Sequence, residues 1–133
     1  MADKNILVAD DMERDVEYLI SDLHMEYGYD GIEYVPDGKS ALERIEKGGL
    51  DAAILDRYMP PKGMSQHEAR EYYGDKVAKK ARELWPNLVL VIRSSDIRGL
   101  DEELKSYDVY CHPKLPGGSD EKLLEHLKSK LGE

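Results

Sequence analysis

Five short apolar runs, separated by longer stretches with a helical repeat, constrain the fold of this sequence more than any other feature. The runs cover residues 6–9, 32–35, 52–55, 88–92 and 109–111. Each run is short for a helix and suits a strand, and the run at 88–92 is apolar enough for the centre of a sheet. Strands that alternate with helices predict an α/β domain whose parallel sheet is covered on both sides.

The stretches between the runs predict the helices. Val16, Leu19 and Leu23 recur at helical spacing, so we expect one helix over 12–27. Ser40 is followed by Glu43 in a capping-box pattern, which predicts that Ser40 caps the second helix. Further helices are expected over 77–85, over 101–106 and after a cap at residue 119.

Composition excludes several classes of protein. The chain has 133 residues, of which 41% are hydrophobic and 35% charged, which is typical of one soluble domain. A net charge of −9 disfavours nucleic acid as a partner and favours a divalent cation or a basic protein surface. No apolar stretch is long enough for a membrane span. The single cysteine, Cys111, cannot form an internal disulfide, and the expected location is therefore the cytoplasm.

Polar side chains follow four of the five apolar runs at the point where each strand is expected to end. Because ligands of open parallel sheets bind outside the carboxyl ends of the strands, these side chains are expected to meet at one edge. They are Asp10 and Asp11 after the first run, Asp56 after the third, Ser94 and Ser95 after the fourth, and Lys114 after the fifth.

Three neighbouring carboxylates repel one another unless a cation lies among them. Oxygen ligands alone favour magnesium or calcium over zinc. A magnesium ion with free positions leaves room for a phosphoryl group, and a carboxylate such as Asp56 can itself attack phosphorus. Simpler roles exist for each residue: Asp10 and Asp11 could cap a helix, Asp56 could open a turn, and Lys114 could be solvated. The convergence of all of them favours the metal site and the phosphoacceptor.

Taken in order, these motifs are similar to those of a known family. VADD at 8–11, the Asp-Gly turn at 37–38, LDRYMP at 55–60, a serine after the fourth run and a lysine after the fifth resemble the receiver domain of two-component response regulators. The resemblance spans 1–133 and implies a chemotaxis-receiver-like, flavodoxin-like (βα)5 fold. Its doubly wound five-stranded parallel sheet has the strand order 2-1-3-4-5.

The resemblance also implies roles for the residues. Asp56 would accept a phosphoryl group from a sensor histidine kinase or a histidine phosphotransfer protein, and a downstream protein partner would read the result. Mg²⁺ would be held by Asp10, Asp11 and Asp56 together with the backbone carbonyl of Tyr58. Ser94 and Lys114 would contact the phosphoryl group. The implied protein is a signalling receiver that catalyses only its own phosphorylation and dephosphorylation.

Two departures from the family pattern stand out. The spacing from Asp56 to Gly74 is longer than usual, which predicts an insertion at about 60–73 between the third strand and the third helix. Ser65 and Glu68 form a capping-box pattern within it, so part of it is expected to be helical and to extend the third helix backward through Gly74. Before Lys114, the position usually held by an aromatic switch residue is Cys111, with Tyr110 one residue earlier.

Two alternatives remain. A degenerate receiver would act as a phosphorylation-independent interaction module, and the two departures motivate it. A magnesium-dependent aspartyl phosphatase is disfavoured because such enzymes usually separate their nucleophile and acid by one residue, whereas Asp10 and Asp11 are adjacent.

Overall fold

A five-stranded parallel sheet forms the centre of the protein, which we describe from a computed structural model covering residues 2–115 and 118–132. The strands are β1 (Ala2–Ala9), β2 (Tyr29–Val35), β3 (Ala52–Leu55), β4 (Val89–Ser94) and β5 (Val109–Pro113). Their order is β2-β1-β3-β4-β5, and every neighbouring pair is parallel. The doubly wound fold and the strand order 2-1-3-4-5 are therefore confirmed.

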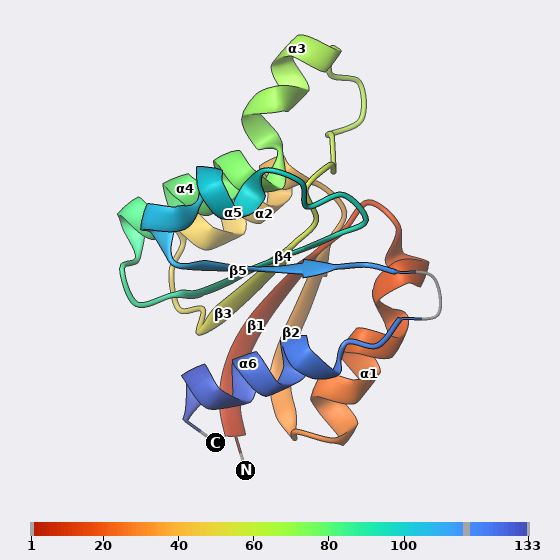
Figure 1. Ribbon diagram of the computed structural model, residues 1–133, viewed down its shortest axis with the longest axis vertical. Helices are drawn as coiled ribbons and strands as arrows, with labels where there is room; N and C mark the ends of the chain where they lie inside the picture. The colour runs from red at the N-terminus through yellow and green to blue at the C-terminus, as the bar shows by residue number, and fades with distance from the viewer. Residues whose placement is uncertain (1, 116–117, 133) are drawn as a thin grey trace.

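Helices cover both faces of this sheet (Figure 1). One face carries α2 (Gly38–Glu46), α4 (Gly74–Leu84) and the short α5 (Leu100–Glu103), and the other carries α1 (Glu17–Met25) and α6 (Glu121–Leu131). Successive residues of a strand point to opposite faces. In β1, Leu7 and Ala9 accordingly join the core on the α4 side, whereas Ile6 and Val8 join the core on the α1 side.

Several predicted helix boundaries are wrong. The helix expected over 12–27 is divided into a 3-10 turn, η1 (Glu13–Val16), and α1. The helix expected over 101–106 is the single turn of α5 followed by the 3-10 turn η3 (Lys105–Tyr107). Asp120 occupies the N-cap position of α6 but its side chain makes no capping bond, whereas the predicted cap, Ser119, lies one residue earlier and its Oγ accepts from Glu121 N at 3.0 Å.

Ser40 does not cap α2, because the helix already begins at Gly38. Asp37 is the N-cap, and its Oδ1 accepts a hydrogen bond from Ser40 N at 2.8 Å. Gly38 can begin the helix because it packs directly against the backbone carbonyl of Tyr72, where a Cβ atom would collide. A contact with so distant a segment decides which of two good capping residues is used.

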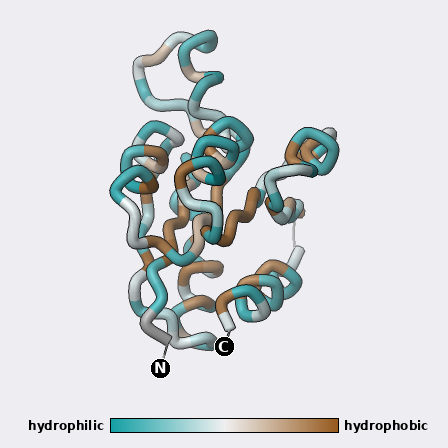
Figure 2. Tube along the Cα trace, turned by 90° about the vertical axis from the view of Figure 1, so that its left-hand side faces the viewer, coloured by the Kyte–Doolittle hydropathy of each residue, from teal (hydrophilic) through white to brown (hydrophobic). Residues whose placement is uncertain are grey.

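Segment 60–73 contains α3 (Gln66–Ala69) and the 3-10 turn η2 (Arg70–Tyr72). The predicted cap is confirmed, because Ser65 Oγ accepts from Glu68 N at 3.2 Å. Figures 1 and 2 show this mainly hydrophilic unit projecting from the α2–α4 layer. It does not extend α4 backward as expected, because Tyr73 is extended (φ −66°, ψ 150°) and α4 begins afresh at Gly74.

Gly74 explains the break. Its N–H donates to Arg57 O at 2.8 Å, and a Cβ atom there would collide with the carbonyl oxygen of Asp56. The start of α4 is thus packed on the backbone that follows β3. Among the described residues, no helix has the length and apolar character needed to cross a bilayer.

Candidate functional site

The carboxylates of Asp10, Asp11 and Asp56 gather at the carboxyl-terminal edge of the sheet. One oxygen from each lies within 4.8 Å of the others, so a single cation could contact all three. Backbone hydrogen bonds that continue the strand ladders position two of them: Asp10 N donates to Val35 O at 3.2 Å, and Asp56 N donates to Ala9 O at 2.9 Å. The structure therefore brings together the three carboxylates that the sequence placed at this edge.

Two of these carboxylates are almost removed from water. Asp10 is 1% exposed and Asp56 is 7% exposed, whereas Asp11 lies open to solvent. Each buried group accepts one backbone hydrogen bond at Oδ1, Asp10 from Met12 N at 2.9 Å and Asp56 from Arg57 N at 2.8 Å. The backbone therefore fixes one oxygen of each carboxylate and leaves Oδ2 for another partner.

Lys114 is that partner. Its Nζ donates to Asp10 Oδ2 at 3.0 Å and lies 3.5 Å from Asp56 Oδ2. It also lies 3.6 Å from Asp15 Oδ2. The side chain is 16% exposed, so these charges interact with little screening by water. The lysine after β5 is thus a half-buried cation of the acidic cluster and not a solvated loop residue.

The cluster raises the pKa of its central carboxyl group. Burial, reinforced by the negative charge of Asp10, raises the pKa of Asp56 from 3.8 to about 6, although Lys114 opposes the shift. Burial and Asp10 also raise the pKa of Asp11. Burial alone would lower the pKa of Lys114, but its hydrogen bond to Asp10 and the neighbouring carboxylates leave that pKa raised. A divalent cation would relieve the repulsion that adds to burial in the two carboxyl shifts.

Ser94 is the last residue of β4, because the strand extends two residues beyond the apolar run at 88–92, and it is 1% exposed. Its Oγ accepts from Asp96 N at 3.4 Å, and its carbonyl accepts from Lys114 N at 2.8 Å. Ser95 is exposed and lines a shallow cavity with Lys114 and Asp15. Of the two serines, Ser94 is the one that the backbone ties directly to Lys114.

Tyr58 lies two residues after Asp56, on the same loop. Its ring is 42% exposed and packs edge-on against Tyr73, with 5.2 Å between the ring centroids. The ring therefore links the loop to the end of segment 60–73. The role of the Tyr58 carbonyl as a metal ligand stays a prediction.

The sequence did not indicate three further neighbours of the site. Tyr34 OH donates to Asp10 O at 2.6 Å, and Tyr34 could have been found because it lies near the carboxyl end of β2. Asp15 comes from η1 and contacts Lys114 only because that turn folds back over the edge. The Arg57 side chain reaches across to the loop after β4, which no local pattern predicts.

The last strand, β5, differs from the family pattern in the position of its aromatic residue, but it contains no bulge. β4 and β5 pair in continuous register up to Ser94 and Pro113. Tyr110 packs on the α6 side, where its ring stacks on His126 with 4.5 Å between centroids. Cys111 faces the opposite core, on the α4 and α5 side. The tyrosine therefore does not face the loop that follows β4.

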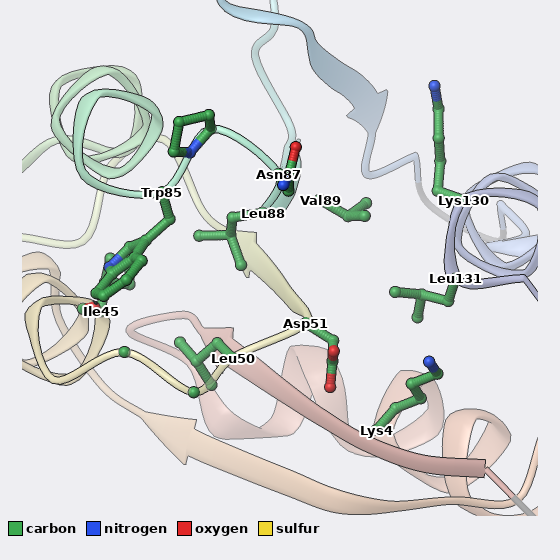
Figure 3. Close-up of a pocket in the computed structure, with 13 residues that line it drawn as sticks. Lys4, Ile45, Leu50, Asp51, Trp85, Asn87, Leu88, Val89, Lys130 and Leu131 are labelled. Carbon is green, nitrogen blue, oxygen red and sulfur yellow. Dashed lines mark hydrogen bonds between the residues drawn. The ribbon is translucent and has the colours of Figure 1, made fainter.

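A separate cavity of about 350 Å³ lies at the other end of the strands. Figure 3 shows Trp85 and Leu50 on one side of it and Lys4 and Leu131 on the other. The Asp51 carboxylate at its floor already accepts a hydrogen bond from Asn5 N at 2.8 Å. The cavity is remote from the acidic cluster and shares no residue with it.

Comparison with known proteins agrees with this geometry. No protein-family model matches the sequence. Among solved structures, a CheY-like response regulator receiver domain from Methanospirillum hungatei JF-1 is 21% identical, with a TM-score of 0.78 over 98% of this chain and 95% of that one. Response regulator TrrA from Thermotoga maritima, solved with Mg²⁺ and BeF, is 27% identical, with a TM-score of 0.73 over 96% of this chain and 98% of that one.

A third structure is the receiver domain of a sensor histidine kinase from Pseudomonas aeruginosa PAO1, in which magnesium is coordinated in the active-site cleft. It is 18% identical, with a TM-score of 0.71 over 99% of this chain and 100% of that one. Over nearly its whole length, the present chain is thus similar to CheY-like response regulator receiver domains and has their fold.

Proposed function

We propose that this protein is a phosphoacceptor receiver of a two-component or phosphorelay signalling system, with Asp56 as the residue that is phosphorylated. One observation carries the proposal: Asp56 lies among Asp10, Asp11 and Lys114 at the carboxyl edge of a receiver fold. Carboxylates that could hold a cation are thereby combined with a lysine that could hold a phosphoryl oxygen. The Mg²⁺- and BeF-bound TrrA structure supports the same reading of this edge.

In the proposed reaction, a carboxylate oxygen of Asp56 forms a bond to phosphorus. The phosphorus–nitrogen bond of a phosphohistidine breaks, and the imidazole leaves with the electron pair and takes up a proton. Mg²⁺, held by Asp10, Asp11, Asp56 and the Tyr58 carbonyl, would neutralise charge on the phosphoryl oxygens. A cation beside Asp56 would favour its ionised form and so would help to keep the nucleophile a carboxylate.

Two further side chains support the proposal, because they could contact the phosphoryl group of an aspartyl phosphate. Lys114 Nζ, now 3.5 Å from Asp56 Oδ2, would exchange that carboxylate oxygen for a phosphoryl oxygen. Ser94 would offer its hydroxyl after giving up the bond from Asp96 N, which is long at 3.4 Å. Phosphorylation would then bias the loops that contain these residues toward a second conformation.

The partners follow from this chemistry. A sensor histidine kinase or histidine phosphotransfer protein would supply the phosphoryl group in the cytoplasm, and a downstream protein would bind the altered surface. The exposed Met12 and Leu115, 51% and 62% exposed, lie next in sequence to Asp11 and Lys114 and could form apolar contacts with such a donor. We also infer that segment 60–73 is an insertion beside the phosphorylation site.

The test is an amide NMR titration of the protein with Mg²⁺ and then with beryllofluoride, a mimic of the phosphoryl group. We expect Mg²⁺ to shift the amides around residues 10, 11 and 56, and beryllofluoride to shift those around Ser94 and Lys114. Asp56→Asn should abolish the second set of shifts. Asp30→Asn should change neither, because Asp30 is exposed and lies at the start of β2, whereas Val35 at the other end of that strand contacts Asp10.

An absence of any response to Mg²⁺ and beryllofluoride in the natural protein would overturn this proposal. The projecting α3 unit favours a second candidate for that case, a phosphorylation-independent interaction module (Figure 2). That module would retain its partner in binding assays with Asp56→Asn, whereas a phosphoacceptor would lose phosphorylation-dependent binding.

A further inference from the structure

The side chain of Arg57, the residue next to the proposed phosphoacceptor, forms hydrogen bonds to the loop after β4. One guanidinium nitrogen, Nη1, donates to the carbonyls of Asp96 and Arg98, each at 3.0 Å. The same nitrogen lies 3.8 Å from the Asp96 carboxylate. The side chain is only 17% exposed, and the bond to the Asp96 carbonyl is partly buried, whereas the bond to the Arg98 carbonyl is exposed. Partial burial strengthens a charge-assisted hydrogen bond such as the first.

The same loop also contacts the hydroxyl of Ser94. Asp96 N donates to Ser94 Oγ at 3.4 Å, so the residue whose carbonyl binds Arg57 also contacts Ser94. The backbone N–H of Arg57 meanwhile donates to Asp56 Oδ1 at 2.8 Å. A single residue thus contacts the carboxylate that would be phosphorylated and, through its side chain, the loop that carries the serine.

No ring from β5 packs in this region among the described residues. Tyr110 stacks on His126 of α6, and the next residue, which faces the α4 and α5 side, is Cys111. Ile97, which lies between the two residues whose carbonyls accept from Arg57, packs against the same core as Cys111. The loop that Arg57 binds therefore packs on the side of the sheet to which the residue three positions before Lys114 points, where the family pattern has an aromatic side chain.

We propose that Arg57 is a positioning residue for the phosphorylation reaction, holding the loop after β4 so that the Ser94 hydroxyl can meet a phosphoryl group on Asp56. This inference rests on the proposed function. The two carbonyl bonds fix the loop backbone at residues 96 and 98. The weak bond from Asp96 N to Ser94 Oγ can then break without loss of the loop's position.

The same guanidinium extends the coupling to segment 60–73. It lies over the Tyr58 ring, 5.2 Å from the centroid, and Tyr58 packs on Tyr73. A shift of Arg57 on phosphorylation would therefore be felt at the start of α4, because Gly74 N donates to Arg57 O at 2.8 Å. Arg57 thus contacts the loop after β4 directly and the end of segment 60–73 through the ring of Tyr58.

The experiment compares Arg57→Met, which keeps the aliphatic stem but removes the donors, with Arg57→Lys, which restores one charged donor. Arg98→Met is the matched control, since it makes the same chemical change in the same loop but removes only a 91% exposed partner of Asp96. For each variant and the natural protein, amide NMR gives the Kd for Mg²⁺ and then the Kd for beryllofluoride, together with the shift of the Ser94 amide.

We expect Arg57→Met to bind Mg²⁺ within about twofold of the natural protein, because the backbone of residue 57 and the three carboxylates remain. Its Kd for beryllofluoride should rise on the order of tenfold, because two charge-assisted hydrogen bonds are lost, and the Ser94 shift should shrink. Arg57→Lys should recover most of the affinity, and Arg98→Met should resemble the natural protein.

The outcomes separate the two proposals. If the natural protein responds to Mg²⁺ and beryllofluoride and Arg57→Met responds equally, the role of Arg57 is refuted and the proposed function stands. If Arg57→Met weakens Mg²⁺ and beryllofluoride binding alike, or if Arg98→Met matches it, a general loss of structure explains the result and the positioning role is also refuted. If the natural protein does not respond at all, both proposals fail together.

Discussion

Replacing Asp56 with asparagine should make the metal-free protein more stable at neutral pH, which is unusual for a buried residue. Asparagine has the same shape and can still accept the hydrogen bond from Arg57 N that now reaches Asp56 Oδ1 at 2.8 Å. What it removes is a charge that is 7% exposed and adjacent to the Asp10 carboxylate. The prediction therefore measures the electrostatic cost of the site when no cation is present.

The raised pKa gives the size and the pH dependence of the effect. Folding raises the pKa of Asp56 from 3.8 to about 6, so the folded state binds its proton more tightly than the unfolded chain. Stability is therefore greatest below the lower value and falls as the pH rises through the upper one. Above pH 6 the ionised group should reduce the free energy of unfolding by about 3 kcal/mol, and near pH 4.5 by only about 1 kcal/mol.

Urea unfolding with chelator present, at about pH 7.5 and about pH 4.5, measures this difference. We expect Asp56→Asn to exceed the natural protein by about 3 kcal/mol at the higher pH, or on the order of 10 °C in Tm, and by much less at the lower pH. Asp30→Asn removes an equal charge from an exposed position and should change stability little.

Equal stability of Asp56→Asn and the natural protein at neutral pH would refute the reasoning, because the charge would then carry no burial cost. A gain that did not shrink at acid pH would also refute it, since the gain would then come from packing and not from ionisation.

Three further predictions follow from the same structure. Millimolar Mg²⁺ should raise the Tm of the natural protein, as measured by differential scanning fluorimetry. The rise should be much smaller in Asp11→Asn, because bound Mg²⁺ stabilises only a folded state that retains its site. Gly74→Ala should lower the free energy of unfolding by about 1–3 kcal/mol in urea titrations, because the added methyl group meets the Asp56 carbonyl while the φ of Gly74 is not positive. Gly49→Ala is the contrasting variant, since no atom lies within 4 Å there but φ is +83°, so its cost is conformational alone. Cys111 should react slowly with iodoacetamide at pH 8, because burial and Asp101 raise its pKa to about 11, and the rate should increase toward that pH; a rate equal to that of free cysteine would contradict this environment.

Local patterns were sufficient to predict the sheet and much of the acidic edge. Runs such as 52–55 are buried on both faces, and a parallel sheet is the architecture that buries strands in that way. Asp10 and Asp56 could be assigned to one edge because carboxyl ends of parallel strands coincide whatever the strand order. The order itself, and the roles of Ser94 and Lys114, depended on resemblance to a family.

Helix boundaries were less predictable, because remote backbone decides them. Ser40 and Asp37 are both good caps, and the choice depends on Gly38 fitting against Tyr72. Gly74 looked like a weak point within one long helix. It is instead the first residue of α4, since only glycine can approach the Asp56 carbonyl so closely. Neither contact leaves a trace in the residues nearby in sequence.

By itself, then, the sequence determined the alternation of strands and helices and the carboxylates at one edge, because both follow from short-range spacing. Only the tertiary structure decided which groups meet those carboxylates. Lys114 reaches Asp10 across 104 residues of chain, and Arg57 reaches the carbonyl of Asp96 across 39. Such partners depend on how strands and loops pack in three dimensions, since a long cationic side chain can point in many directions and packing alone selects one.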